Sequence, residues 1–412
     1  YSAWPRADPR MSRRRPKARR STVVAGPAGG AKAGAGRPPR SRRLLLASAA
    51  VLGMAGLAIG LAASFAARRP ERLREAAEAA TRAGDWPRAL EAWRALNQTR
   101  LARGRTYFQE ARACLALGRA ADAERSLRQA VAADPSDPDP WLLALQICRI
   151  EDRQVDALDW GWRGYVAVPA SSRAQILRDL TLALLAEPPD DIVLPTLDRW
   201  VEADPNDANA RVARLRRGAS GSRGEMLDPS ERIQALAAIL AVDPANPSTR
   251  EDLFAALADS GRVNESRNVL ESWPEATRDV RYLRLRGRRE LDFEDRPEPA
   301  LRDFETTLRD LPHDWKTRSR AARALRRLGR NEQARAESNT VLRLLETLDP
   351  ARLGPRLDQA LNHLDNPASS ADLAALCERL GLERLAEAWR LEARRRAATA
   401  APTPLQTAIP PE

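Results

Sequence analysis

The sequence predicts an all-α fold, an array of stacked helical hairpins, and three observations support this prediction. Ala and Arg dominate the composition while β-branched residues are sparse, which favours helix over strand. Small residues and prolines recur at an interval of 34 residues, the length of one helix–turn–helix unit. Asp-Pro pairs recur where the second helix of a unit should end. We therefore expect hairpins that stack in single file, each covering the apolar face of the next.

The 34-residue interval occurs in two series. The positions that share it are Ala89, Ala123 and Ala157, Pro135 and Pro169, and Cys114 and Cys148 in the first series, and Ser266, Ala300 and Ala334 in the second. Between the two series the phase slips by seven residues, which requires an insertion. The Gly- and Ser-rich segment Arg216–Glu231 is the predicted insertion.

The helix ends follow from residue type. Gly118 is expected to end the first helix of its hairpin, because glycine readily adopts the left-handed conformation that closes a helix. Pro135, Pro205 and Pro244 are each expected to end a second helix, because proline disfavours helix at the residue before it.

The apolar residues are expected to pack between helices. Ala123 and Ala130 are small where two helix backbones cross closely, and Leu127 fills the space between units. Packing is also the expected role of most tryptophans, namely Trp93, Trp141, Trp160, Trp162, Trp200, Trp273, Trp315 and Trp389. In the sequence "WGW", however, either Trp160 or Trp162 must face away from the core of its unit.

These features resemble the tetratricopeptide repeat (TPR) family over about residues 73–397. The residues that carry the resemblance are Ala111, Leu117, Gly118, Ala123, Leu127, Ala130 and Pro135 in one unit and Trp141, Leu145, Cys148, Ala157, Gly161, Gly164 and Pro169 in the next. The segments Arg326–Leu342 and Cys377–Ala393 look like later units. The resemblance implies a right-handed solenoid of helical hairpins that binds other proteins.

The predicted organisation has seven segments. In chain order they are a disordered basic arm (1–43), a transmembrane helix (44–67), N-terminal repeats (71–215), the loop insertion (216–231), a second repeat block (232–348), terminal helices with a capping hairpin (349–397) and a disordered tail (398–412).

The net charge of +12 is confined to the N-terminal arm. Residues 1–43 hold 13 Lys or Arg and one acid, Asp8, whereas the rest of the chain carries 55 basic and 55 acidic residues. A nucleic-acid footprint should lie on the folded part of a protein, so the neutral repeat region argues against a nucleic-acid partner.

The segment Leu44–Ala67 contains 24 residues and no charge. As a helix rising about 1.5 Å per residue it would span about 36 Å, enough for the ~30 Å hydrocarbon core. Basic residues are in excess before it, so the positive-inside rule places the arm in the cytoplasm and the repeats beyond the cytoplasmic membrane. Gly56 and Gly60 form a small-xxx-small pair that could favour a homodimer.

Two alternatives remain open for this segment. "SFA" at Ser64–Ala66 could serve as a signal-peptide cleavage site, and "SRRLLL" at Ser41–Leu46 resembles a twin-arginine export signal. In either case the repeats would be released as a soluble exported adaptor.

The sequence offers little for catalysis or for a cofactor. Cys114, Cys148 and Cys377 are too scattered for a zinc site or a disulfide framework and are expected to be buried core thiols. His313 and His363 have no second metal ligand three or four residues away. We therefore expect no metal, no cofactor and no enzyme activity.

An active site in the irregular middle of the chain, residues 174–232, is the rival hypothesis. Paired acids occur there at Asp190–Asp191 and within Glu202–Asp207, but such pairs are typical of helix caps and turns.

The family resemblance implies a partner groove along the first helices of the hairpins. The residues at its groove positions are Arg105, Phe108 and Arg112, then Leu142, Gln146 and Arg149, and finally Lys316, Ser319, Arg323 and Arg326. The last set is basic and could clamp an acidic tail, although a solvated helix face is the alternative. The predicted function is a membrane-anchored scaffold of the cell envelope that binds peptides or helices of protein partners.

Overall fold

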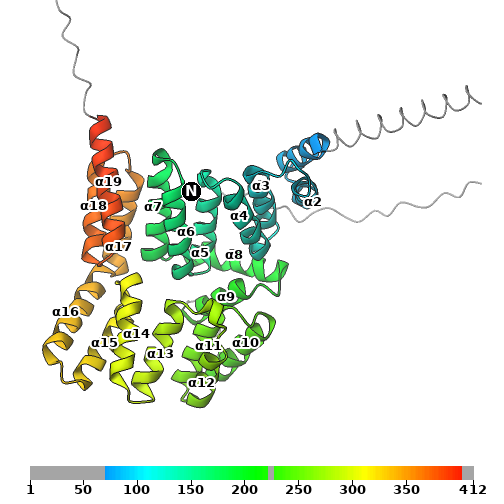
Figure 1. The fold of residues 1–412 in the computed structure, drawn as a ribbon. Coiled ribbons are helices and arrows are strands. Elements are labelled where there is room, and N and C mark those ends of the chain that lie inside the picture. Colours follow the sequence, from blue (N-terminus) through cyan, green and yellow to red (C-terminus); the bar gives the residue numbers. More distant parts are fainter. Residues whose placement is uncertain (1–69, 221–226, 401–412) are drawn as a thin grey trace, which may run out of the picture. The chain divides into compact units, whose positions relative to one another are not determined.

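The computed structural model describes residues 70–220 and 227–400 (Figure 1). The basic arm, the transmembrane segment Leu44–Ala67 with its Gly56 and Gly60, and residues 401–412 lie outside these ranges, so the expectations for them stay predictions. Among the helices that are described, none has both the length and the apolar character of a membrane span.

All regular secondary structure in the described ranges is helical, as predicted. A first helix covers residues 70–82. The others are α2 (Trp86–Asn97), α3 (Gly104–Ala116), α4 (Ala120–Ala133), α5 (Pro138–Ile150), α6 (Gln154–Ala167), α7 (Ala170–Leu185), α8 (Asp190–Ala203), α9 (Ala208–Ser220), α10 (Pro229–Val242), α11 (Pro247–Asp259), α12 (Val263–Glu271), the 3₁₀ helix η1 (Glu275–Thr277), α13 (Val280–Asp292), α14 (Pro297–Asp310), α15 (Trp315–Arg327), α16 (Asn331–Thr347), α17 (Pro350–Asn362), α18 (Pro367–Arg379) and α19 (Glu383–Ala400).

A left-handed turn recurs between the two helices of a hairpin. Its residues have positive φ and lie 34 residues apart, at Gly84, Gly118 and Asp152 in the first series and at Gly261, Asp295 and Gly329 in the second. Backbone hydrogen bonds close the preceding helix in the manner of a Schellman motif, for example from Arg119 N to Cys114 O at 2.9 Å. The prediction for Gly118 is therefore confirmed, and Asp, which tolerates this conformation better than most residues, replaces glycine at two turns.

A second repeated contact fixes the entry into a hairpin. The side chain six residues after a proline donates to the carbonyl of that proline, from Trp141 to Pro135 at 3.0 Å, from Arg250 to Pro244 at 3.0 Å and from Arg318 to Pro312 at 2.7 Å. Because Trp and Arg share only an N–H donor at the end of a long side chain, the repeat preserves a hydrogen bond rather than a residue type.

The predicted packing positions are buried. Ala123, Leu127 and Ala130 have no exposed surface, and α4, α8 and α10 each end on the residue before an Asp-Pro pair. Trp160 is buried while Trp162 is half-buried, so one tryptophan of the "WGW" sequence does face away from the core of its unit. The predicted insertion (216–231) is in part helical, since α9 continues to Ser220 and α10 begins at Pro229.

The single-file stacking that we expected breaks after α7. Pro188 and Pro189 hold the connection to α8 extended, with Pro189 at φ −59° and ψ 140°, and no left-handed turn folds α8 back onto α7. The end of α8 instead lies against the earlier α3–α4 turn, where a Cβ on Gly118 would come within 2.8 Å of Cβ of Ala203.

The terminal hairpin of α18 and α19 takes the place beside α7 (Figure 1). Trp389 Nε1 on α19 donates to Thr181 Oγ1 on α7 at 3.1 Å, and both residues are fully buried. The Arg384 guanidinium lies 4.0 Å from the ring centroid of Trp162 on α6. Residues of α18 and α19 consequently belong to the same hydrophobic core as those of α3 to α7.

Candidate functional site

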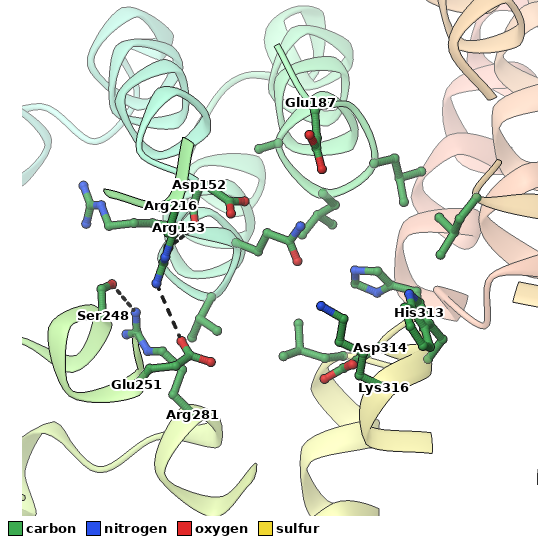
Figure 2. Close-up of a pocket in the computed structure, with 18 of the residues that line it drawn as sticks. Asp152, Arg153, Glu187, Arg216, Ser248, Glu251, Arg281, His313, Asp314 and Lys316 are labelled. Atoms are coloured by element: carbon green, nitrogen blue, oxygen red, sulfur yellow. Dashed lines mark hydrogen bonds and ion pairs between the residues drawn. The ribbon is translucent and has the colours of Figure 1, made fainter. Parts of the chain in front are cut away.

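The first helices of successive hairpins surround a cavity of about 890 Å³. Its walls come from the turn between α5 and α6, the end of α7, and from α9, α11, α13, α15 and α17. Figure 2 shows side chains from these elements directed toward a common space, with charged groups on one side and His313, Asp314 and Lys316 on the other.

Ion pairs fix the charged side of the cavity. Arg216 Nε on α9 lies 2.9 Å from Asp252 Oδ2 on α11. Arg284 on α13 contacts Glu251 on α11 and lies 2.9 Å from Asp314 Oδ2 at the start of α15. Burial opposes ionisation of Glu251, but the nearby arginines outweigh it and lower the pKa of this carboxyl. The carboxylates thus hold α9, α11, α13 and α15 in register around the cavity.

A buried carboxylate joins the two sides of the chain. Asp156 on α6 lies 3.1 Å from Arg153 and 2.9 Å from Arg281, which comes 125 residues later on α13. Burial would raise the pKa of Asp156, yet the two arginines outweigh burial and lower it. Arg153 also contacts Glu124 and Glu151, and burial raises the pKa of Glu151 to about 8.

The opposite side combines apolar and basic groups. Leu184, Leu185, Leu353 and Leu357 line it together with the half-buried Trp315. These side chains come from α7, α15 and α17, so the wall depends on the position that α17 takes between the second repeat block and the terminal hairpin.

The polar residues of this side lie where α15 begins. Asp314 caps the helix, accepting from Thr317 N at 3.0 Å and from Thr317 Oγ1 at 2.6 Å. His313 is 6% exposed, its Nδ1 has no hydrogen-bond partner, and burial lowers the pKa of its imidazole to about 4. Lys316 and Arg320 line the cavity one helical turn apart.

The structure brings two of the ten predicted groove residues to this cavity, Arg149 and Lys316. Arg105 and Arg112 line a separate cavity of about 600 Å³ formed with α2 and the helix over residues 70–82. Phe108 is 7% exposed and belongs to the core, under the Arg105 guanidinium at 5.0 Å, so it offers almost no surface to a partner.

The other predicted groove residues line neither of these cavities. Leu142 is half-buried against the core, and Gln146 is exposed. On α15, Ser319 is half-buried, and Arg326 is exposed with Nη1 3.5 Å from Ser338 Oγ. Arg323 is neutralised by Asp292, with 2.6 Å between Nη2 and Oδ1.

Several cavity residues were not expected from the sequence. Arg320 follows Lys316 by four residues on a helix, so helical spacing alone could have placed it beside Lys316. Arg216, Arg284 and Glu251 carry no such signal, because each is matched by a partner more than 30 residues away.

Residues 104–147 match the tetratricopeptide repeat family. No curated protein sequence matches the chain significantly. Among solved structures, the P58(IPK) TPR domain is 15% identical, with 81% of this chain and 99% of that chain covered and a TM-score of 0.29.

Two further solved structures are similar. A tetratricopeptide repeat protein from Parabacteroides merdae is 13% identical, with 63% of this chain and 99% of that chain covered and a TM-score of 0.29. The Cut9–Hcn1 hetero-tetramer of APC/C is 16% identical, with 78% and 66% covered and a TM-score of 0.32. The chain therefore contains a segment that matches the tetratricopeptide repeat, and the left-handed turn of that segment recurs along the described helices.

Proposed function

We propose that this protein is a scaffold whose cavity between α5 and α17 holds a segment of a partner protein. The observation that carries the proposal is the origin of the walls, since the cavity collects the first helices of successive hairpins rather than the residues of one hairpin. Such surfaces suit extended peptides and helices. A volume of about 890 Å³ falls within the range of ligand sites in proteins.

The rigidity of the charged wall also supports binding. Its arginines are already paired with carboxylates on neighbouring helices, so a partner would meet side chains that are ordered in advance. The chemistry of the described residues favours binding over nucleophilic catalysis as well. The three cysteines are buried, and burial raises the pKa of Cys114 and of Cys377 to about 12, which keeps them as unreactive thiols at neutral pH.

We further propose that the scaffold is anchored in the cytoplasmic membrane by Leu44–Ala67, with the repeats beyond the membrane. The support for this part is the uncharged length of that segment and the excess of basic residues before it. Carbonate extraction of membranes, followed by N-terminal sequencing of the mature protein, tests it. Release into the soluble fraction with a new N-terminus near Ala66 would favour the exported adaptor instead.

Gly354 provides a sharp test of the cavity. It lies on α17 in the cavity wall, and a Cβ built on it would meet no atom within 4 Å. Gly354→Trp should therefore fill the cavity with an indole, while Gly354→Ala should leave it open and give the matched control.

The experiment is a crosslinking pull-down of the full chain from solubilised membranes. We expect the unchanged protein and Gly354→Ala to capture the same partner, and Gly354→Trp to lose it. Capture of that partner by all three proteins would place the binding surface elsewhere.

A further inference from the structure

We propose that His313, Lys316 and Arg320 form a subsite for an oxyanion, a carboxylate or a phosphate, that is attached to an apolar group of the partner segment. This inference rests on the proposed function, because it names the chemistry of the group that enters the same cavity. It also predicts binding of small compounds that contain only this group, which can be measured without the partner.

The first argument is that the basic groups here lack acids. Most arginines of the cavity have a carboxylate within 4.0 Å, including Arg216, Arg281 and Arg284. Lys316 and Arg320 have none among the described residues. Lys316 lies over the ring of Trp315, with Nζ 5.7 Å from the ring centroid, which leaves its charge available.

The acids nearest to Arg320 are already engaged. Asp314 caps α15 and accepts from Arg284, and Asp292 lies 2.6 Å from Arg323. Arg288, the other basic neighbour, lies 2.5 Å from Asp259. Burial first, and then Arg288, lower the pKa of Arg320, which means that the free protein holds this charge at a cost. An entering anion would remove that cost.

His313 supplies the second, independent argument. Its ring is more than nine-tenths buried, lines the cavity and is directed into it beside Lys316 (Figure 2). Its Nδ1 has no partner, and a proton there would be an unsatisfied buried donor. The neutral ring therefore carries its proton on Nε2, which is left to donate to a ligand in the cavity.

The apolar wall defines the rest of the ligand. Leu353 and Leu357 on α17 and Leu184 and Leu185 on α7 line the same cavity as the three polar groups. An oxyanion that accepts from His313 and Arg320 would therefore bring any attached apolar group against leucine side chains. The ligand class is a branched or linear aliphatic group that carries a carboxylate or a phosphate.

The test uses full-length protein and two pairs of small probes. N-acetylleucine is compared with its neutral amide, and isopentyl phosphate with isopentyl alcohol, by saturation-transfer difference NMR at low ionic strength. The variants are Arg320→Gln and its matched control Arg326→Gln, which removes the same charge from an exposed position of α15 outside the cavity.

We expect at least one anion to bind the unchanged protein and Arg326→Gln with equal affinity, and its neutral partner to bind about 10-fold more weakly or worse. Arg320→Gln should weaken the anion about 10-fold or more while folding with unchanged or higher stability, because it removes an uncompensated charge. Lys316→Gln, an exposed position without an ion pair, gives a second variant with the same expected direction. Preference for the carboxylate or for the phosphate probe identifies the oxyanion.

Equal binding of the anionic and neutral probes, no binding of either anion, or unchanged binding by Arg320→Gln would each overturn the inference. These outcomes are distinguishable from failure of the proposed function. If Gly354→Trp loses the partner but neither anion binds, the scaffold proposal stands and the oxyanion subsite does not. If an anion binds but no partner is captured, the subsite stands without the scaffold.

Discussion

The contact between α7 and α19 can be tested by comparing two buried tryptophans. Trp389 on α19 donates from Nε1 to Thr181, whereas Nε1 of Trp200 on α8 has no partner although both side chains are buried. Replacing either with Phe removes a similar part of an indole from the core. Trp389→Phe also loses a hydrogen bond worth about 1 kcal/mol, and Trp200→Phe removes an unsatisfied donor whose burial costs about 1–3 kcal/mol.

The free energy of unfolding should therefore fall by about 2 kcal/mol more in Trp389→Phe than in Trp200→Phe, as measured by urea denaturation followed by circular dichroism. A double-mutant cycle with Thr181→Val should give a coupling energy of about 1 kcal/mol between α19 and α7. Equal losses in the two Phe variants together with zero coupling would refute the closure of the terminal hairpin onto α7.

Three further predictions concern the turns, the buried histidine and the buried ion pairs. Asp295→Gly should raise the free energy of unfolding by about 0.5–1 kcal/mol, because it relieves a φ of +51° and loses only an exposed ion pair, whereas Gly118→Ala should lower it; thermal denaturation measures both. His313 has its pKa lowered from 6.5 to about 4, so its contribution to stability is present above pH 6.5 and lost as pH falls toward 4. The stability advantage of the unchanged protein over His313→Gln should then shrink by about 3 kcal/mol between pH 7 and pH 4 in urea titrations, and a pH-independent difference would contradict a neutral buried ring. Arg281→Met should cost about 3–5 kcal/mol of unfolding free energy because it leaves Asp156 buried with one partner fewer, while Arg352→Met at an exposed pair should cost less than about 1 kcal/mol.

The local features of the hairpins were predictable from the sequence. Residue type fixes where a helix stops, so the Asp-Pro pairs and Gly118 gave correct ends, and the 34-residue interval gave the buried positions of Ala123 and Ala157. The interval also leads from Gly118 to Asp152, so the left-handed turn at an Asp could have been found by counting rather than by residue type.

The arrangement of the hairpins was not predictable in the same way. The contact between Trp389 and Thr181 joins residues 208 positions apart, and no local pattern specifies it. The ion pairs of the cavity have the same origin, since Arg281 meets Asp156 only because α8 redirects the chain. Groove positions carried over from a regular solenoid consequently missed Arg320 and His313, and included Phe108, which the core covers.

The most direct test of the central claim, that partners bind in the cavity between the first helices, is site-specific photocrosslinking. A benzophenone amino acid is placed at Gly354 in the cavity wall or at Ala336, an exposed residue of α16 outside it, and full-length protein is irradiated in cells. The account predicts a discrete partner adduct from position 354 and none from position 336. Adducts from position 336 alone, or the same adducts from both positions, would contradict it.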